Sequence, residues 1–202
     1  VAPLIQRLDD VDEAGVIRCA AAAALGQLGH ETGTEALLRV AQSAQPDDVR
    51  IASILALGPS GDTRAVEPLC ALIDALRDGR PDLGLAAVRT LGVLASSDAV
   101  PSLMDSLEWL STLPRGAAHA ELDVWRGQVL ESLYRIVVEP AVRRASLLRT
   151  ARLRPLISTE ALRRELGAGV APNNAYAAHV LGWLGRPDAL PDLIGCLNTT
   201  DS

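Results

Sequence analysis

Few residues of this sequence have the types and spacing that catalysis or metal binding requires. Its three histidines lie far apart, and no two share a spacing suited to one metal site: His30, His119 and His179. Its three cysteines lie in separate apolar helical patterns, which predicts neither a disulfide nor a zinc site: Cys19, Cys70 and Cys196. No P-loop, dinucleotide fingerprint or Gly-x-Ser-x-Gly elbow is present. We therefore expect no catalytic, metal-binding or cofactor-binding residues, and a protein that is not an enzyme.

A basic stretch between Pro140 and Ile157 is the first candidate binding feature. It holds five arginines and no acid, whereas the whole chain has a formal net charge of −6, so the remainder carries −11. Guanidinium groups bind carboxylates and phosphates through paired hydrogen bonds, which favours an acidic partner. On a helical wheel the five spread around the axis, so a solvated or internally paired segment is the alternative. The arginines are Arg143, Arg144, Arg149, Arg152 and Arg154.

Three of the five aromatic residues lie in or beside the longer segment 111–157, which includes this basic stretch: Trp109, Trp125 and Tyr134. Aromatic and arginine side chains are over-represented at binding hot spots. Trp109 and Trp125 therefore join the five arginines as predicted partner-binding residues. The alternative is that these rings fill space in an irregular unit, and Tyr176 and Trp183 are interpreted as packing residues.

Composition limits the class of protein. Apolar residues make up 49% of the chain and aromatic residues 2%, with no Phe, so Ala, Leu, Val and Ile must form the interior. The acidic net charge argues against a nucleic-acid partner, which requires a basic face. No run approaches the roughly 18 apolar residues that span a bilayer, and no signal peptide is evident. We expect a cytoplasmic protein without membrane association.

Four segments repeat around a Leu-Gly pair, at residues 16–29, 48–61, 82–95 and 173–186. Their glycines are Gly26, Gly58, Gly92 and Gly182. The first three lie 32 and 34 residues apart, the spacing of a helical-hairpin solenoid. Since a helical Gly costs about 1 kcal/mol relative to Ala, its recurrence indicates either close approach of a neighbouring helix or an early helix end. In the first segment we expect Ile17, Ala21, Ala24, Leu25 and Leu28 to face the core.

A second apolar motif occurs at residues 1–8, 34–41, 66–73, 100–107, 159–166 and 190–197. Short clusters of Asp, Gly and Pro, such as Gly61-Asp62 and Arg186-Pro187-Asp188, stand before several of these segments and can turn the chain and cap a helix. Each repeat unit is therefore predicted to be a helix A, a tight turn and a helix B.

The helix A motif, as in VEPLCALI at 66–73, together with VIRCAAAAALGQLG at 16–29, resembles the short HEAT repeats of phycobilisome-lyase-type proteins. The resemblance covers nearly all of residues 1–110 and again 158–198. It implies an all-α fold, a right-handed α-α superhelix or ARM-like solenoid of about five to six helical hairpins, in one repeat domain over residues 1–202. It is unspecific for function, because such repeats occur in lyase subunits, adaptors, signalling proteins and sensor regions.

The repeat is interrupted once. Val100 and Thr159 are 59 residues apart, roughly 25 more than the usual interval of 31 to 34. We expect a helix at about 98–110, a loop at 111–119, a long helix at about 120–138 and an additional helix from Pro140 to about Leu153, so that 111–157 is an irregular insertion. The chain begins with Val1 inside a helical pattern, which indicates an excerpt of a longer protein.

These features favour a scaffold that presents a curved solenoid surface to a protein partner. Two alternatives stay open: a lyase-type accessory subunit that binds a tetrapyrrole or another small ligand in the groove, as the resemblance implies, and a sensor or regulatory region of a larger signalling protein. The last helix, at about 188–198, has no helix B to cover it. Its apolar flank predicts cover by further chain, by a partner or by self-association.

Overall fold

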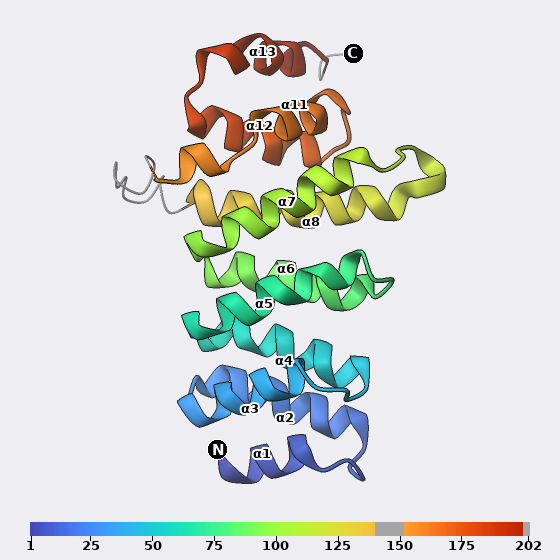
Figure 1. Cartoon of the computed structure of the whole chain (residues 1–202), viewed down its shortest axis with the longest axis vertical. Helices are drawn as coiled ribbons and strands as arrows, with labels where there is room; N and C mark the ends of the chain where they lie inside the picture. Colours follow the sequence, from blue (N-terminus) through green and yellow to red (C-terminus); the bar gives the residue numbers. More distant parts are fainter. Residues whose placement is uncertain (140–151, 200–202) are drawn as a thin grey trace. The chain divides into compact units, whose positions relative to one another are not determined.

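The computed structural model describes residues 1–139 and 152–199, and side chains in 1–139 and 152–195. Every regular element in these ranges is a helix (Figure 1). The additional helix predicted from Pro140 lies almost wholly outside the described residues. The chain separates into two compact units, Val1–Ser96 and Ser97–Ser202. One continuous repeat domain over residues 1–202 stays a prediction.

Unit 1 contains three helical hairpins. They are formed by α1 (Ala2–Asp9) with α2 (Gly15–Leu28), α3 (Glu31–Ala41) with α4 (Asp47–Ser60), and α5 (Val66–Leu72) with α6 (Pro81–Leu94). Short 3-10 helices precede and extend α5, at Thr63–Ala65 and Ile73–Leu76. The B helices α2, α4 and α6 pack against one another in order, and the A helices α3 and α5 cover α4 and α6.

Unit 2 repeats this plan. Its elements are α7 (Val100–Thr112), α8 (Ala120–Val137), α11 (Thr159–Gly167), α12 (Asn173–Leu184) and α13 (Leu190–Thr199), with 3-10 turns at Ser97–Ala99, Ala117–His119, Arg154–Leu156 and Pro187–Ala189. The hairpins α7–α8 and α11–α12 join through contact between the B helices α8 and α12, and α13 packs against α11. The predicted A and B helices are thus found with bounds that differ mostly by one to three residues.

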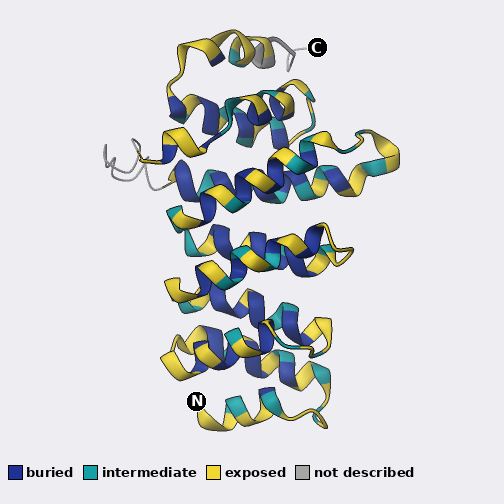
Figure 2. Ribbon diagram, viewed as in Figure 1, coloured by how far each residue is buried: buried dark blue, intermediate teal, exposed yellow. Residues whose placement is uncertain are grey.

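Small aliphatic side chains fill the core. The described buried apolar residues are Ala, Leu, Val and Ile with one methionine, Met104, as the lack of Phe predicted. Buried and exposed stripes alternate along the same helices (Figure 2). The stripe predicted for α2 needs correction at two positions, because Ile17 and Leu28 are 42% and 58% exposed. The buried face of α2 instead carries Arg18, a long polar side chain at a position that an apolar pattern ignores.

The recurring glycines stand in two different packing environments. A Cβ on Gly26 would stand 2.2 Å from the carbonyl oxygen of Ala56, so α2 approaches the backbone of α4 closely. A Cβ on Gly182, by contrast, would meet nothing within 4 Å. The αL ends of the B helices come a few residues later, at Gly29, Gly61, Ala95 and Gly185.

Candidate functional site

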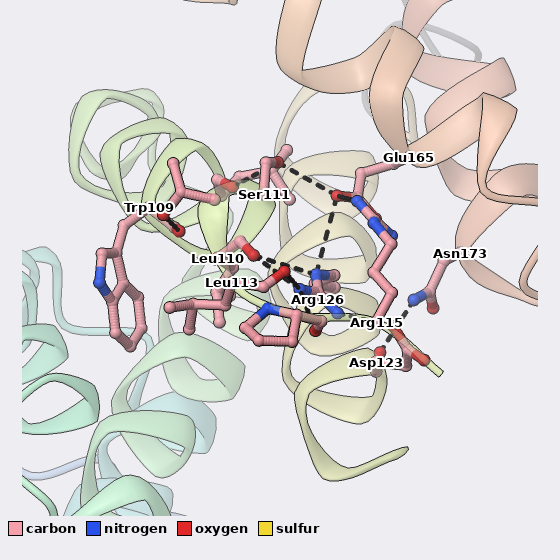
Figure 3. Close-up of polar contacts among 12 residues, drawn as sticks. Trp109, Leu110, Ser111, Leu113, Arg115, Asp123, Arg126, Glu165 and Asn173 are labelled. Atoms are coloured by element: carbon pink, nitrogen blue, oxygen red, sulfur yellow. Dashed lines mark hydrogen bonds and ion pairs between the residues drawn. The ribbon is translucent and has the colours of Figure 1, made fainter. Parts of the chain in front are cut away.

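The seven predicted partner-binding residues fall into three groups. Arg143, Arg144 and Arg149 lie outside the described residues. Arg152 and Arg154 are exposed at the entry to α11. Trp109 on α7 and Trp125 on α8 are half-buried, and the indole of Trp109 points away from Arg126 (Figure 3). A partner-binding role for this set stays a prediction.

A pocket of about 390 Å³ lies between α8, from Ala120 to Glu131, and the start of α12. Its walls are mainly apolar, with Ala120 and Val124 from α8, and Val170 and Pro172 from the turn before α12. Val124 is 60% exposed although it is aliphatic. The volume lies at the lower end of the range for ligand-binding pockets, and mostly apolar walls with a few polar groups are typical of them.

Two carboxylates line the pocket, those of Asp123 and Glu131. Asp123 Oδ1 accepts a hydrogen bond of 2.7 Å from Arg126, and Glu131 Oε1 accepts one of 2.6 Å from Arg135. Each carboxylate has a second oxygen, and its side chain is only partly buried. None of the residues that line the pocket is Arg or His.

An aromatic cluster adjoins the pocket. The ring of Tyr134 on α8 lies 5.6 Å from that of Tyr176 and 5.4 Å from that of His179, both on α12, with tilted planes. Tyr176 also lines the pocket, so the cluster and the cavity form one surface. We call this surface, the pocket together with Tyr134 and His179, the α8–α12 face.

Tyr134 stands at the position of the repeated glycine. Arg126 precedes it by eight residues, just as Arg18 precedes Gly26 and Arg50 precedes Gly58. In unit 1 this position lets α2 approach the backbone of α4, because no side chain stands between the two helices. In unit 2 a phenol ring occupies it and contacts two rings of the next B helix. A ring of this size precludes such a close approach, which is consistent with an open pocket beside it.

Arg126 anchors α8 to the end of α7 (Figure 3). Its side chain has no exposed surface, and it donates hydrogen bonds to the backbone carbonyls of Leu110, Leu113 and Pro114 at 2.7 to 3.2 Å. These carbonyls lie at and just beyond the end of α7, where helix hydrogen bonds run out. A cation there also complements the negative end of the helix dipole.

A buried acid extends the same network to the next hairpin. Glu165 of α11 is fully buried, and its Oε1 atom lies 3.9 Å from Nε of Arg126. Arg115, in the loop after α7, donates to both oxygens of Glu165 at 2.6 and 3.2 Å, and Ser111 donates at 3.1 Å. Asn173 at the start of α12 donates to the carbonyl of Asp123 at 2.8 Å. The network therefore fixes both helices that form the pocket.

A buried arginine also binds the carbonyls at a helix end in unit 1. Arg18 donates to the carbonyl of Leu8 at 3.0 Å and Arg50 to that of Ala41 at 3.2 Å, each near the end of the preceding A helix. Both arginines are at most 5% exposed. The apolar periodicity of these helices gives no indication of this role. The sequence signal for this role is an Arg eight residues before the glycine of the Leu-Gly pair, as at Arg18 and Arg50.

Within residues 1–139 and 152–199, no three His, Cys, Asp or Glu side chains gather as a group that can hold a metal ion. No helix among the described residues is both long and apolar enough to cross a bilayer.

Stacked helical hairpins in both units define the class of this protein as an α-solenoid. Residues 1–75 match the family of HEAT repeats. None of the curated proteins compared matches the sequence.

The solved structures that are similar in fold include the following two. One is the complex of CpcE and CpcF of phycocyanin lyase from Nostoc sp. PCC7120, with a TM-score of 0.55, 22% identity, and coverage of 94% of this chain and 78% of that chain. The other is an engineered protein, with a TM-score of 0.60, 16% identity, and coverage of 97% and 84%. These similarities concern the helical-repeat fold alone.

Proposed function

We propose that this protein is a non-enzymatic scaffold that binds a protein partner on the α8–α12 face. The observation that carries the proposal is the pocket between α8 and α12 with Tyr176 in its wall. A cavity beside an exposed aliphatic side chain and half-buried aromatic rings can hold an anchoring side chain of a partner.

The energetics of this face support binding. Val124 exposes an aliphatic side chain at the pocket, and covering such surface contributes roughly 25 cal/mol per Å². Tyr134 and Tyr176 add rings with few rotatable bonds, which lose little conformational entropy on binding. The network of Arg126 and Glu165 holds α8 and α11 in place beforehand, so that little ordering remains for the binding step.

A matched pair of substitutions tests the proposal. Val124→Glu places a charge in the pocket wall, whereas Val11→Glu makes the same change at a 69% exposed valine in the turn after α1. Each variant is used as bait in a pull-down from the native organism, alongside the unchanged protein. We expect Val124→Glu alone to lose partners. Retention of every partner by Val124→Glu contradicts the proposed site.

The arginine-rich segment is a second candidate surface for the same function. Arg152 and Arg154 are its described exposed members. The double variant Arg152→Glu/Arg154→Glu enters the same pull-down as a third bait. Loss of partners in that variant, with Val124→Glu unaffected, moves the binding surface to the basic segment.

The alternative function is that of a lyase-type accessory subunit. The pocket and its aromatic neighbours favour it, since a conjugated pigment stacks on rings, and the similar solved structure is described as a phycocyanin lyase complex. The pocket carboxylates of Asp123 and Glu131 oppose it, because they would face the propionates of a bilin. Mixing the protein with a bilin and recording its absorbance tests this function, and a shifted spectrum that Val124→Glu abolishes supports it.

Self-association through the last helix is a separate proposal. Leu190 and Ile194 of α13 are 56% and 50% exposed. The measurement is sedimentation velocity of the protein and of a Leu190→Glu/Ile194→Glu variant. Self-association is supported if the unchanged protein is a dimer and the variant is a monomer. A monomeric unchanged protein at all concentrations contradicts it.

A further inference from the structure

Resting on the proposed function, we infer that the pocket of the α8–α12 face binds an arginine side chain of the partner. The charges in the pocket, the shape of its walls and the ring of Tyr176 favour this occupant.

The charged groups that line the pocket are all acids. Asp123 and Glu131 face the cavity without an Arg or His among the lining residues. Helix α12, which forms the opposite wall, contains no Asp, Glu or Arg. An incoming cation therefore meets two carboxylates in the wall, and the arginines that pair with them, Arg126 and Arg135, lie outside the lining.

The ion pairs within the chain engage one oxygen of each carboxylate, Oδ1 of Asp123 and Oε1 of Glu131. Arg126 is fully buried and divides its hydrogen bonds among three carbonyls and Asp123. The pair of Glu131 with Arg135 is only partly buried, with side chains 28% and 42% exposed. Such pairs within a helix surface contribute little, so a guanidinium from a partner can replace or join Arg135.

The partial positive charges of the helix N-termini at this pocket oppose the binding of a cation. The N-terminus of a helix favours negative charge, and both α8 and α12 begin here. Acids of the chain itself already occupy the first turn of α8, namely Glu121 and Asp123. A second anion would be repelled by Asp123 and Glu131, and these full charges outweigh the partial charge of a helix end.

The walls fit the rest of an arginine side chain. Val124, Val170 and Pro172 offer apolar surface to its methylene groups, and the ring of Tyr176 offers a face to its planar guanidinium. Arginine suits the pocket better than lysine, because it forms paired hydrogen bonds with a carboxylate and stacks on aromatic rings. The volume of about 390 Å³ leaves room for a neighbouring residue of the partner.

The test is an NMR titration of the full chain with N-acetyl-arginine amide. We expect saturable shifts in the backbone amides of Gln128, Glu131 and Tyr176. N-acetyl-citrulline amide, which has the same shape without the charge, should bind about tenfold more weakly. The opposite probe, N-acetyl-glutamate amide, should leave these signals unchanged.

Two variants locate the interaction. Glu131→Gln should weaken binding of the arginine amide about threefold, the loss of one partly exposed ion pair. Glu121→Gln, which removes an exposed acid of the same helix outside the pocket lining, should leave the affinity unchanged.

Three results overturn the inference: no shifts at these amides, equal binding of the citrulline probe, or preferential binding of the glutamate probe. These outcomes are independent of the proposed function. If Val124→Glu loses the partner while the arginine amide does not bind, the face is correct and only its occupant is wrong. If Val124→Glu keeps every partner, the proposed function fails whatever the titration shows.

Discussion

The guanidinium of Arg126 and the carboxylate of Glu165 are both fully buried, with Nε and Oε1 3.9 Å apart. They belong to different hairpins, since Arg126 lies on α8 and Glu165 on α11. Each has further partners in the segment from Leu110 to Arg115, which comprises the last residues of α7 and the start of the loop after it. One buried pair thus joins a helix end, a loop and two helices.

Arg126→Leu should lower the free energy of unfolding of unit 2 by about 3 to 5 kcal/mol. The substitution leaves three carbonyls without their donor and leaves Glu165 with one cation fewer in the interior. Urea denaturation followed by tryptophan fluorescence measures the change, because Trp109, Trp125 and Trp183 all lie in unit 2. Arg135→Gln is the control, since its partly exposed pair with Glu131 predicts a loss of about 0.5 kcal/mol or less. Equal losses in the two variants contradict a special role for Arg126.

Alanine at two copies of the repeated glycine should act in opposite directions. Gly26→Ala places a Cβ 2.2 Å from the backbone oxygen of Ala56, which cannot rotate away, so we expect destabilisation by about 3 kcal/mol. Gly182→Ala meets nothing within 4 Å and should stabilise by about 0.5 to 1 kcal/mol through helix propensity.

Far-UV circular dichroism follows the Gly26→Ala variant, because unit 1 has no aromatic residue, and fluorescence follows Gly182→Ala. The same sign of change in both variants would show that the two glycines share one role.

Ala95→Gly should stabilise unit 1 by about 1 kcal/mol. Ala95 ends α6 with φ 51° and ψ 33°, a left-handed conformation that costs a residue with a Cβ roughly this much. The reciprocal control is Gly61→Ala at the end of α4, where φ is 68° and no atom crowds the site. That variant should lose a similar amount. Thermal denaturation followed by circular dichroism measures both, and an unchanged midpoint for Ala95→Gly refutes the expectation.

The thiol of Cys19 should react slowly with iodoacetamide at pH 8. Burial first, and the nearby carboxylate of Asp48 second, raise the pKa of Cys19 above its ordinary value. A raised pKa means that less thiolate is present at a given pH, so the alkylation rate should rise only at higher pH than for a free cysteine.

The rate is measured against pH in a chain with Cys70→Ser and Cys196→Ser. Asp48→Asn should move the midpoint part of the way back, because burial remains. A midpoint equal to that of the urea-unfolded chain disproves the shift.

The amino-acid pattern alone determined the helices and their order. Apolar stripes, Asp and Gly turn signals and a repeat of 32 to 34 residues are local features, and each hairpin depends mainly on its own residues and its neighbours. For that reason α2, α4, α8 and α12 begin and end within two residues of the predicted bounds. The α-solenoid class followed from the same periodicity.

Only the tertiary structure decided the roles of the residues that depart from the repeat pattern. An Arg in an apolar segment looks the same in sequence whether it faces solvent or a helix end, so the burial of Arg18, Arg50 and Arg126 went unrecognised. The role of Tyr134 likewise depends on the packing of α8 against α12. Tyr134 stands at the position of the repeated glycine, and its ring contacts that of Tyr176. The pocket is formed by helices that start about 50 residues apart, and no local pattern records the space left between them.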